Sequence, residues 1–434
     1  MKTNLYLLFF ISLVCLGSCD KEEDVLIADP QNVVEEKSDL TKNLTVELVK
    51  NFATMTSSNK DNRFISKSTD IPSGGIIIDE CVKTTCMIDL NGTILTKSGD
   101  QTMPDSTTVD LYLVNFHSED GTKGFSIATG DKRLNKVYAY TEKGSIGDTA
   151  KIYPLACAIK SIPSVVKADI EKYYQEPSLR EARQVIGVIS GPHVKTHWNQ
   201  DYPYNSMCPY FASVESDRYL KGHAPVGCAA VATAQVVAYY QRFTSSVRDV
   251  HTGLPYKYDF FELTRNPKIS YELDRDNPLV FEVSQLCYEI GVGCQIKWSD
   301  RKGNLDDPRK IATYLTSKQG YSIECDNDAN VDINKLSRNI QRGNPHISAG
   351  TRKKPQSGHV WIWDGVQVNA NSEVTLVHCN WGHGFTSGIS DSDGWYTISR
   401  MEQPDPDMQP YFDDNVQILS LIHISEPTRL DVIS

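Results

Sequence analysis

A cysteine at a predicted helix start and a distant histidine are the residues of this chain best suited to nucleophilic chemistry. Cys228 follows Gly227 and opens an almost wholly apolar run at residues 229–240, which predicts a buried central helix that begins at about Cys228. A thiol in that position lies near free backbone N–H groups and the positive end of the helix dipole, which favour the nucleophilic thiolate. Taken alone, a buried and inert cysteine that packs at a helix start remains the commoner explanation.

His359 provides the base that a cysteine nucleophile requires. Residues 357–365 alternate so that His359 and two tryptophans share one face, which predicts a strand. Residues 373–382 predict a second strand, and residues 369–372 between them have the composition of a turn. The two strands therefore form a predicted hairpin that carries the histidine. The alternative for this residue is an imidazole that is satisfied in the core or at the surface.

Asn380 is the predicted partner of His359. A tight turn centred on Asn369 and Ala370 would pair His359 with Asn380, although a longer loop would change this register. Asn380 could then accept a hydrogen bond from one ring nitrogen and direct the other toward Cys228. His359 follows Cys228 by about 130 residues, and the order Cys, His, Asn is that of papain-like cysteine peptidases.

Three segments of the sequence resemble the signature blocks of the streptopain family of cysteine peptidases: residues 226–235, 358–365 and 380–382. The likeness extends to residues 198–205, where Gln200 matches the family's oxyanion-hole glutamine and would act with the backbone N–H of the nucleophile. Trp381 matches the tryptophan that shields the His and Asn pair. A surface amide and an ordinary core tryptophan are the alternatives for these two residues. His383 departs from the family pattern, which usually has a tryptophan there.

The resemblance implies a cysteine endopeptidase that hydrolyses peptide bonds of protein or peptide substrates, needs no cofactor and is made as an inactive zymogen. The implied fold is α+β. It is a papain-like peptidase of two subdomains, with a central helix and an antiparallel β-sheet or barrel, preceded by a small α+β propeptide domain. Residues 187–419 form the expected peptidase domain.

Residues 46–165 predict the small α+β domain ahead of the peptidase. This domain begins with a helix near residues 46–54, and residues 110–116 and 123–129 predict a hairpin. Parts of it resemble the propeptide of streptopain-like zymogens, which implies that the chain carries its own intramolecular inhibitor. The charged residues 166–186 that follow predict an exposed linker, helical in part, that suits proteolytic processing.

The N-terminus predicts export and a lipid anchor. Residues 1–18 combine a positive start with an apolar stretch too short to span a bilayer permanently, which predicts a cleavable signal peptide. Residues 16–19 resemble a bacterial lipobox, which implies that Cys19 is lipidated; ordinary secretory cleavage near Ser18 is the alternative. The acidic residues 19–45 predict a flexible tether. The expected location is the bacterial cell envelope or surface, on a Gram-negative outer membrane, with release after processing.

Charge and cysteine content limit the expected partners. The formal net charge is -11 and the 44 Lys and Arg residues are scattered, which argues against nucleic acid as a partner. No Cys-x-x-Cys motif recurs at zinc spacing, so no metal site is expected. Of the 11 cysteines, Cys15 and Cys19 belong to the signal, and the odd remainder leaves at least one unpaired unless it bonds another chain. Cys81 and Cys86 are candidates for a local pair.

Two other functions are compatible with parts of this pattern. A cell-wall peptide amidase also uses a cysteine followed by a histidine, but such domains generally place the two much closer together and lack a propeptide of this size. A peptidase-like surface binding protein without activity would have no need to keep the whole set of candidate residues.

The C-terminal end departs from the pattern of a peptidase. Residues 415–419 predict a final strand. Residues 420–434 resemble translated sequencing-adapter read-through, so this tail is suspected to be non-native.

Overall fold

The chain folds into two compact units. A computed structural model describes residues 31–60, 75–90, 104–147, 153–176, 186–326, 332–352, 357–383, 392–397 and 417–420. The first unit takes in Met1–Ser190, Val366–Val377 and Ser392–Tyr411, and the second takes in Gly191–Gly365, His378–Asp391 and Phe412–Ser434. The predicted signal peptide, the lipidation site Cys19 and the tail beyond Ser420 lie outside the described residues. Within the described part of the chain, no helix is long and apolar enough to cross a membrane.

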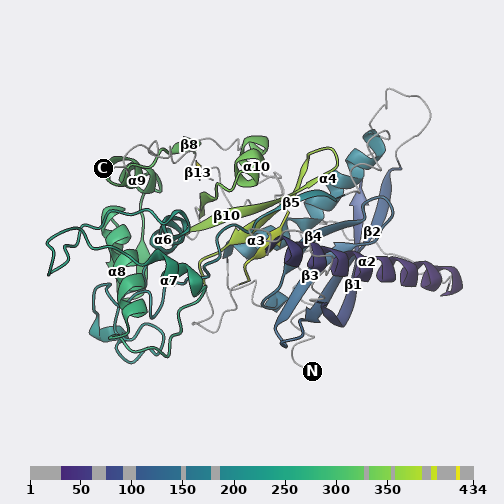
Figure 1. Cartoon of the computed structure of the whole chain (residues 1–434). Coiled ribbons are helices and arrows are strands. Elements are labelled where there is room, and N and C mark those ends of the chain that lie inside the picture. The colour runs from purple at the N-terminus through teal and green to yellow at the C-terminus, as the bar shows by residue number, and fades with distance from the viewer. Residues whose placement is uncertain are drawn as a thin grey trace, which may run out of the picture. The chain divides into compact units, whose positions relative to one another are not determined.

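An antiparallel sheet with α2 packed across it forms much of the first unit (Figure 1). The elements are α2 (Gln31–Lys60), β1 (Ile77–Asp89), β2 (Ser106–His117), β3 (Lys123–Thr129), β4 (Lys136–Thr141), α3 (Tyr153–Lys160), α4 (Ile162–Gln175), β5 (Ile186–Ser190) and β12 (Gly394–Tyr396). Strands β1 to β4 pair in sequence order, and β12 pairs with β4. Helix α2 contributes Val49 and Phe52 to the shared core. The predicted hairpin of residues 110–116 and 123–129 is confirmed.

Helix α2 begins well before the predicted start of the first domain. The sequence predicts a flexible tether over residues 19–45, but residues 31–45 are helical, so the prediction is wrong for this part. Thr45 is fully buried, and its hydroxyl accepts a hydrogen bond from the Gly130 backbone N–H at 2.7 Å. The same hydroxyl donates to the Thr41 carbonyl at 2.7 Å. The buried Thr45 thus fixes this polar part of the helix by hydrogen bonds. Such a helix lacks the apolar periodicity on which the sequence prediction relies.

The predicted linker at residues 166–186 also differs in part. Its first half lies in α4, whose residues Val166 and Ile170 are buried. Because apolar residues recur at helical spacing, this half is a packed element of the first unit and not an exposed linker. Residues 177–185 lie outside the described residues.

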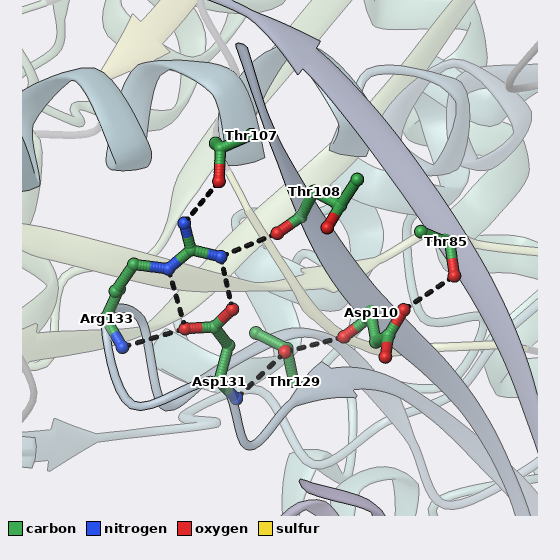
Figure 2. A network of polar contacts seen from close by, with 7 residues as sticks. All are labelled: Thr85, Thr107, Thr108, Asp110, Thr129, Asp131 and Arg133. Carbon is green, nitrogen blue, oxygen red and sulfur yellow. Dashed lines mark hydrogen bonds and ion pairs between the residues drawn. The ribbon is translucent and has the colours of Figure 1, made fainter. Parts of the chain in front are cut away.

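A network of polar contacts ties the turn after β3 to β2 (Figure 2). The Arg133 guanidinium donates to both carboxylate oxygens of Asp131, at 3.0 and 2.6 Å. It also donates to the Thr107 hydroxyl and the Thr108 carbonyl, both at 2.6 Å. Such a bidentate pair fixes geometry as well as charge, so this charged turn has a structural role within the first unit.

A buried helix and antiparallel strands form the second unit. Its helical elements include η3 (Ala212–Val214), α6 (Cys228–Tyr240), α7 (Phe260–Arg265), α8 (Pro278–Gly293), α9 (Arg309–Gln319) and α10 (Ile333–Gln341). Its strands include β6 (Lys297–Ser299), β7 (Lys302–Asn304), β8 (Glu324–Asp326), β9 (His346–Arg352) and β13 (Gln417–Ser420). Strands β10 (Ser357–Asn369) and β11 (Val374–Asn380) contribute residues to both units.

The strands of the second unit run in the order β10, β9, β13, β8, and each neighbouring pair is antiparallel. Helix α6 is buried from Ala229 to Ala238 and shares its core with α7 and α8, which lie beside it in Figure 1. The predicted α+β fold, with a central helix and an antiparallel sheet, is confirmed. The predicted final strand is also present, as β13.

Glu289 on α8 fixes the loop that follows α6. Glu289 is only 5% exposed, and its carboxylate accepts hydrogen bonds from the hydroxyls of Ser245 and Ser246, both at 2.7 Å. The Ser246 backbone N–H donates at 2.6 Å, and the Tyr258 hydroxyl donates as well. Burial raises the pKa of the Glu289 carboxyl, but these hydrogen bonds outweigh burial and leave the pKa below its ordinary value.

We expect Glu289→Gln to lower the free energy of unfolding by about 1–3 kcal/mol at neutral pH, because an amide cannot accept all of these hydrogen bonds. Since the folded-state pKa is depressed, the stabilisation is complete above the unfolded-state pKa and is lost as pH falls through the folded-state pKa. Urea unfolding should therefore show a smaller difference between the two proteins at about pH 3 than at pH 7. The control Glu119→Gln, at an exposed position, should leave the free energy of unfolding unchanged at both pH values. Equal stability of Glu289→Gln and wild type at pH 7 would contradict this role.

Candidate active site

Cys228 is the first residue of α6, as the sequence predicts. The preceding Gly227 caps the helix with a φ of 97°, a backbone conformation that favours glycine. A Cβ on Gly227 would lie 2.7 Å from the Gly303 carbonyl oxygen, so the two backbones meet without room for a side chain. Trp298 donates from its indole Nε1 to the Val226 carbonyl at 3.2 Å. The β6–β7 hairpin therefore helps to set where the helix begins.

The Cys228 sulfur lies beside the strand that carries His359. The backbone N–H groups of Val360 and Ala229 act on the half-buried sulfur as hydrogen-bond donors. Burial nevertheless raises the pKa of the Cys228 thiol above its ordinary value, since burial outweighs these donors. The thiol is thus the favoured form in this structure, in contrast to the thiolate expected from the helix start alone.

The hydrogen bond of His359 defines which ring nitrogen can accept a proton. Nε2 lies 2.9 Å from the Trp381 carbonyl oxygen. Because a carbonyl oxygen only accepts, Nε2 carries the ring hydrogen and Nδ1 is left as the proton acceptor. Burial lowers the pKa of His359 to about 4, although the Trp381 carbonyl favours the charged form. At neutral pH the imidazole is therefore an uncharged base.

Aromatic rings enclose the His359 imidazole. Its ring centroid lies 4.7 Å from that of His383, with 12° between the planes, and 6.2 Å from that of Trp361, with 9° between the planes. The rings of Trp361 and Trp363 are 6.1 Å apart, so the predicted shared face of these three β10 residues is confirmed. Burial, together with the neighbouring His359, lowers the pKa of His383 to about 3. Stacking against these rings restricts rotation of the His359 ring.

The Asn380 side chain bonds to Gln235 and to the backbone. Its Nδ2 donates to the Thr196 carbonyl at 2.7 Å and to Gln235 Oε1 at 3.2 Å. Its Oδ1 accepts from Gln235 Nε2 and from the Gly382 backbone N–H, each at 3.2 Å. The predicted hydrogen bond from His359 to Asn380 is not made between these described residues, and the Trp381 carbonyl takes its place.

The length of the hairpin turn explains this difference. The Asn369 N–H donates to the Glu373 carbonyl at 2.9 Å, so the turn is longer than the predicted one. The strands pair in a shifted register, in which the His359 ring stacks on His383. The predicted register, with His359 opposite Asn380, is therefore wrong.

Gln200 and Trp381 both lie close to the residues already described. The Gln200 carbonyl accepts from the Val226 N–H at 2.8 Å, which holds the Gln200 backbone beside the residues that lead into Cys228. Trp381 is 1% exposed, and its ring packs 5.7 Å from that of Trp361. The second unit thus brings the candidate residues together around one helix start and one hairpin.

Sequence reasoning missed Gln235 and the Trp381 carbonyl. Gln235 did leave a signal, because a long polar side chain in a helix that is buried on every face needs a partner. The Trp381 carbonyl left no signal in the sequence, because every residue has a backbone carbonyl. Only the strand register decides which carbonyl contacts the imidazole.

Among the described residues, Cys81, Cys208, Cys228, Cys287 and Cys294 are free thiols. The suggested local pair of Cys81 with Cys86 is therefore wrong. Both lie on β1, separated by an odd number of positions, so their side chains point to opposite faces of the strand. Among the described residues, no group of three or more His, Cys, Asp and Glu side chains could hold a metal ion.

A thiol at the start of a buried helix, beside the antiparallel strand that carries an uncharged imidazole, is an arrangement typical of a cysteine hydrolase. Residues 198–396 match the model of the Peptidase C10 family. Over these residues the chain is similar to the Peptidase C10 family, and it is a cysteine-type peptidase.

Several known proteins are similar to this chain. Streptopain of Streptococcus pyogenes is 24% identical over 311 residues, which cover 65% of this chain and 72% of streptopain. A fragment of Prevotella intermedia prointerpain A is 19% identical, with a TM-score of 0.47 over 78% of this chain and 99% of the fragment. Active interpain A of the same species is 21% identical, with a TM-score of 0.39 over 54% of this chain and 95% of the interpain chain.

Proposed function

We propose that this chain is the precursor of a cysteine endopeptidase in which Cys228 is the nucleophile and His359 carries the protons. One observation carries the assignment. His359 Nε2 donates to the Trp381 carbonyl, which leaves the uncharged Nδ1 free to accept a proton. The next residue, Val360, donates its backbone N–H to the Cys228 sulfur, so the imidazole and the thiol come from adjoining parts of the site. The match of residues 198–396 to the Peptidase C10 family model supports the same reaction.

The proposed reaction has two halves. His359 Nδ1 accepts the Cys228 proton while the sulfur attacks the peptide carbonyl, and a tetrahedral intermediate forms. The Cys228 backbone N–H and the Gln200 amide stabilise its negative oxygen. His359 returns the proton to the leaving amine, and the C–N bond breaks to give a thioester. Water then attacks the thioester with His359 as base, which releases the acid and restores the thiol.

Asn380 and Trp381 position His359 in this proposal. Asn380 Oδ1 holds the Gly382 N–H at 3.2 Å, so it fixes the short segment whose Trp381 carbonyl accepts from His359. The Trp381 ring excludes water from the imidazole. Asn380 therefore orients His359 through the backbone and not by direct contact.

The first domain is proposed as an intramolecular inhibitor that is removed on activation, and the natural substrates are proteins or peptides. The resemblance of residues 46–165 to zymogen propeptides supports this assignment. The signal-like residues 1–18 and the lipobox-like residues 16–19 support export and attachment of Cys19 to a membrane lipid.

Covalent labelling of the matured chain tests the proposal. An epoxide that reacts with active cysteine peptidases should form one adduct, on Cys228, and stop hydrolysis of casein; mass spectrometry of the digested protein locates the adduct. The fully buried Cys287 is an internal control that should stay unlabelled. Turnover of peptidoglycan with no turnover of casein would identify an amidase instead. Absence of both activities and of the adduct would indicate a binding protein.

A further inference from the structure

Gln235 is the one long polar side chain buried along α6. It is fully buried, as are its alanine, valine and threonine neighbours in the middle of this helix. A carboxamide in such a place costs about 1–3 kcal/mol unless it is hydrogen-bonded. The bonds that Gln235 makes are therefore a requirement of the fold, and their partners show what the side chain holds in place.

Those partners lie on separate segments that carry candidate residues. Gln235 Oε1 accepts from the Trp198 backbone N–H at 3.0 Å, two residues ahead of Gln200 in the chain. Gln235 and Asn380 form a reciprocal amide pair, in which each side chain donates to the other at 3.2 Å. One amide on the helix that begins at Cys228 thus connects the segment before Gln200 with the end of β11.

The connection continues to the imidazole. Asn380 Oδ1 also accepts from the Gly382 N–H at 3.2 Å, and Trp381 lies between these two residues. Gly382 has a φ of 66°, which turns the backbone at this point. The Trp381 carbonyl, held by this turn, accepts from His359 Nε2 at 2.9 Å.

We propose that Gln235 is a positioning residue for the Cys228 and His359 reaction, and that it acts through Asn380 by holding the turn that aims the Trp381 carbonyl at His359. This inference rests on the proposed function. If Gln235 were purely structural, its replacement would lower the stability of the fold but leave kcat and KM of the folded enzyme unchanged. Replacement of a positioning residue instead lowers kcat and changes KM little.

The test compares Gln235→Met, which keeps the length of the side chain but removes its hydrogen bonds, with the matched control Thr233→Val. Thr233 is also fully buried on α6, but its hydroxyl donates only within the helix, to the Ala229 carbonyl at 2.7 Å. The full chain is matured, and the casein-peptide hydrolysis rate is divided by the amount of folded, processed protein. Gln235→Met should lower kcat by about 100-fold with KM within about twofold, whereas Thr233→Val should leave both unchanged.

A double-substitution cycle with Asn380→Ala separates the proposed route from a general effect. If Gln235 acts through Asn380, the double variant should be no slower than the slower single variant. The proposal would be overturned if the losses in kcat of the two single variants multiplied in the double variant. A wild-type kcat for Gln235→Met would also overturn it, as would a kcat that recovers fully at a temperature where this variant is completely folded. Cys228→Ala is measured alongside, because hydrolysis by that variant would refute the proposed nucleophile whatever the Gln235 variants show.

Discussion

Cys228→Ala should lower peptide-bond hydrolysis by about 10⁶-fold, since removal of a nucleophile leaves only the acceleration that binding and the oxyanion hole provide. The variant should still fold, because the sulfur is half-buried and alanine suits the first turn of α6. Release of fluorescent peptides from labelled casein measures the rate, and circular dichroism with thermal unfolding confirms the fold. The isolated variant should also keep the mass of the precursor, if maturation depends on the chain's own activity.

Cys81→Ala is the matched control, because Cys81 is also a half-buried free thiol but lies on β1 of the first unit. This variant should hydrolyse casein at the wild-type rate. Retention of the wild-type rate by Cys228→Ala would end the assignment of the nucleophile. Maturation of the isolated Cys228→Ala chain, without hydrolysis, would show only that another peptidase removes the first domain.

His359→Ala should lower kcat by about 10²- to 10⁴-fold at pH 7, because no group is then in place to accept the thiol proton. Burial lowers the pKa of His359 to about 4, so the imidazole is an uncharged base above that pH and is protonated below it. The wild-type rate should therefore fall as pH is lowered through about 4. The residual rate of His359→Ala should instead rise toward alkaline pH with the thiolate fraction, since burial raises the pKa of Cys228.

Profiles of kcat/KM against pH for both proteins measure this difference. His251→Ala provides a control at an exposed histidine, and its profile should match that of the wild type. The same acid limb in His359→Ala and in the wild type would show that another group is responsible for it.

Much of the site follows from local patterns that the sequence displays. The start of α6 is predictable because a glycine precedes an apolar run, and the face of β10 is predictable because His359 and its tryptophans alternate. Both patterns depend on neighbours in the chain. The helical start of α2 was missed because the contact of Thr45 with Gly130 joins positions far apart in the sequence.

The partner of His359 was not predictable for a related reason. A difference of a few residues in the hairpin turn changes every cross-strand neighbour, and the composition of residues 369–372 does not fix the turn length. Backbone acceptors such as the Trp381 carbonyl depend on register alone. Sequence patterns therefore identify the reacting side chains better than the groups that orient them.

The pairing of β5 with β10 affects what activation can remove. Ser190 pairs with Val366, and Ile186 pairs with Asn369, so β5 covers one edge of the strand whose other end carries His359. Cleavage ahead of Ile186 keeps this edge covered, whereas cleavage after Ser190 leaves a row of backbone donors and acceptors open to pairing with other molecules. The position of the cut should thus decide whether the mature enzyme stays dispersed in solution or self-associates into aggregates.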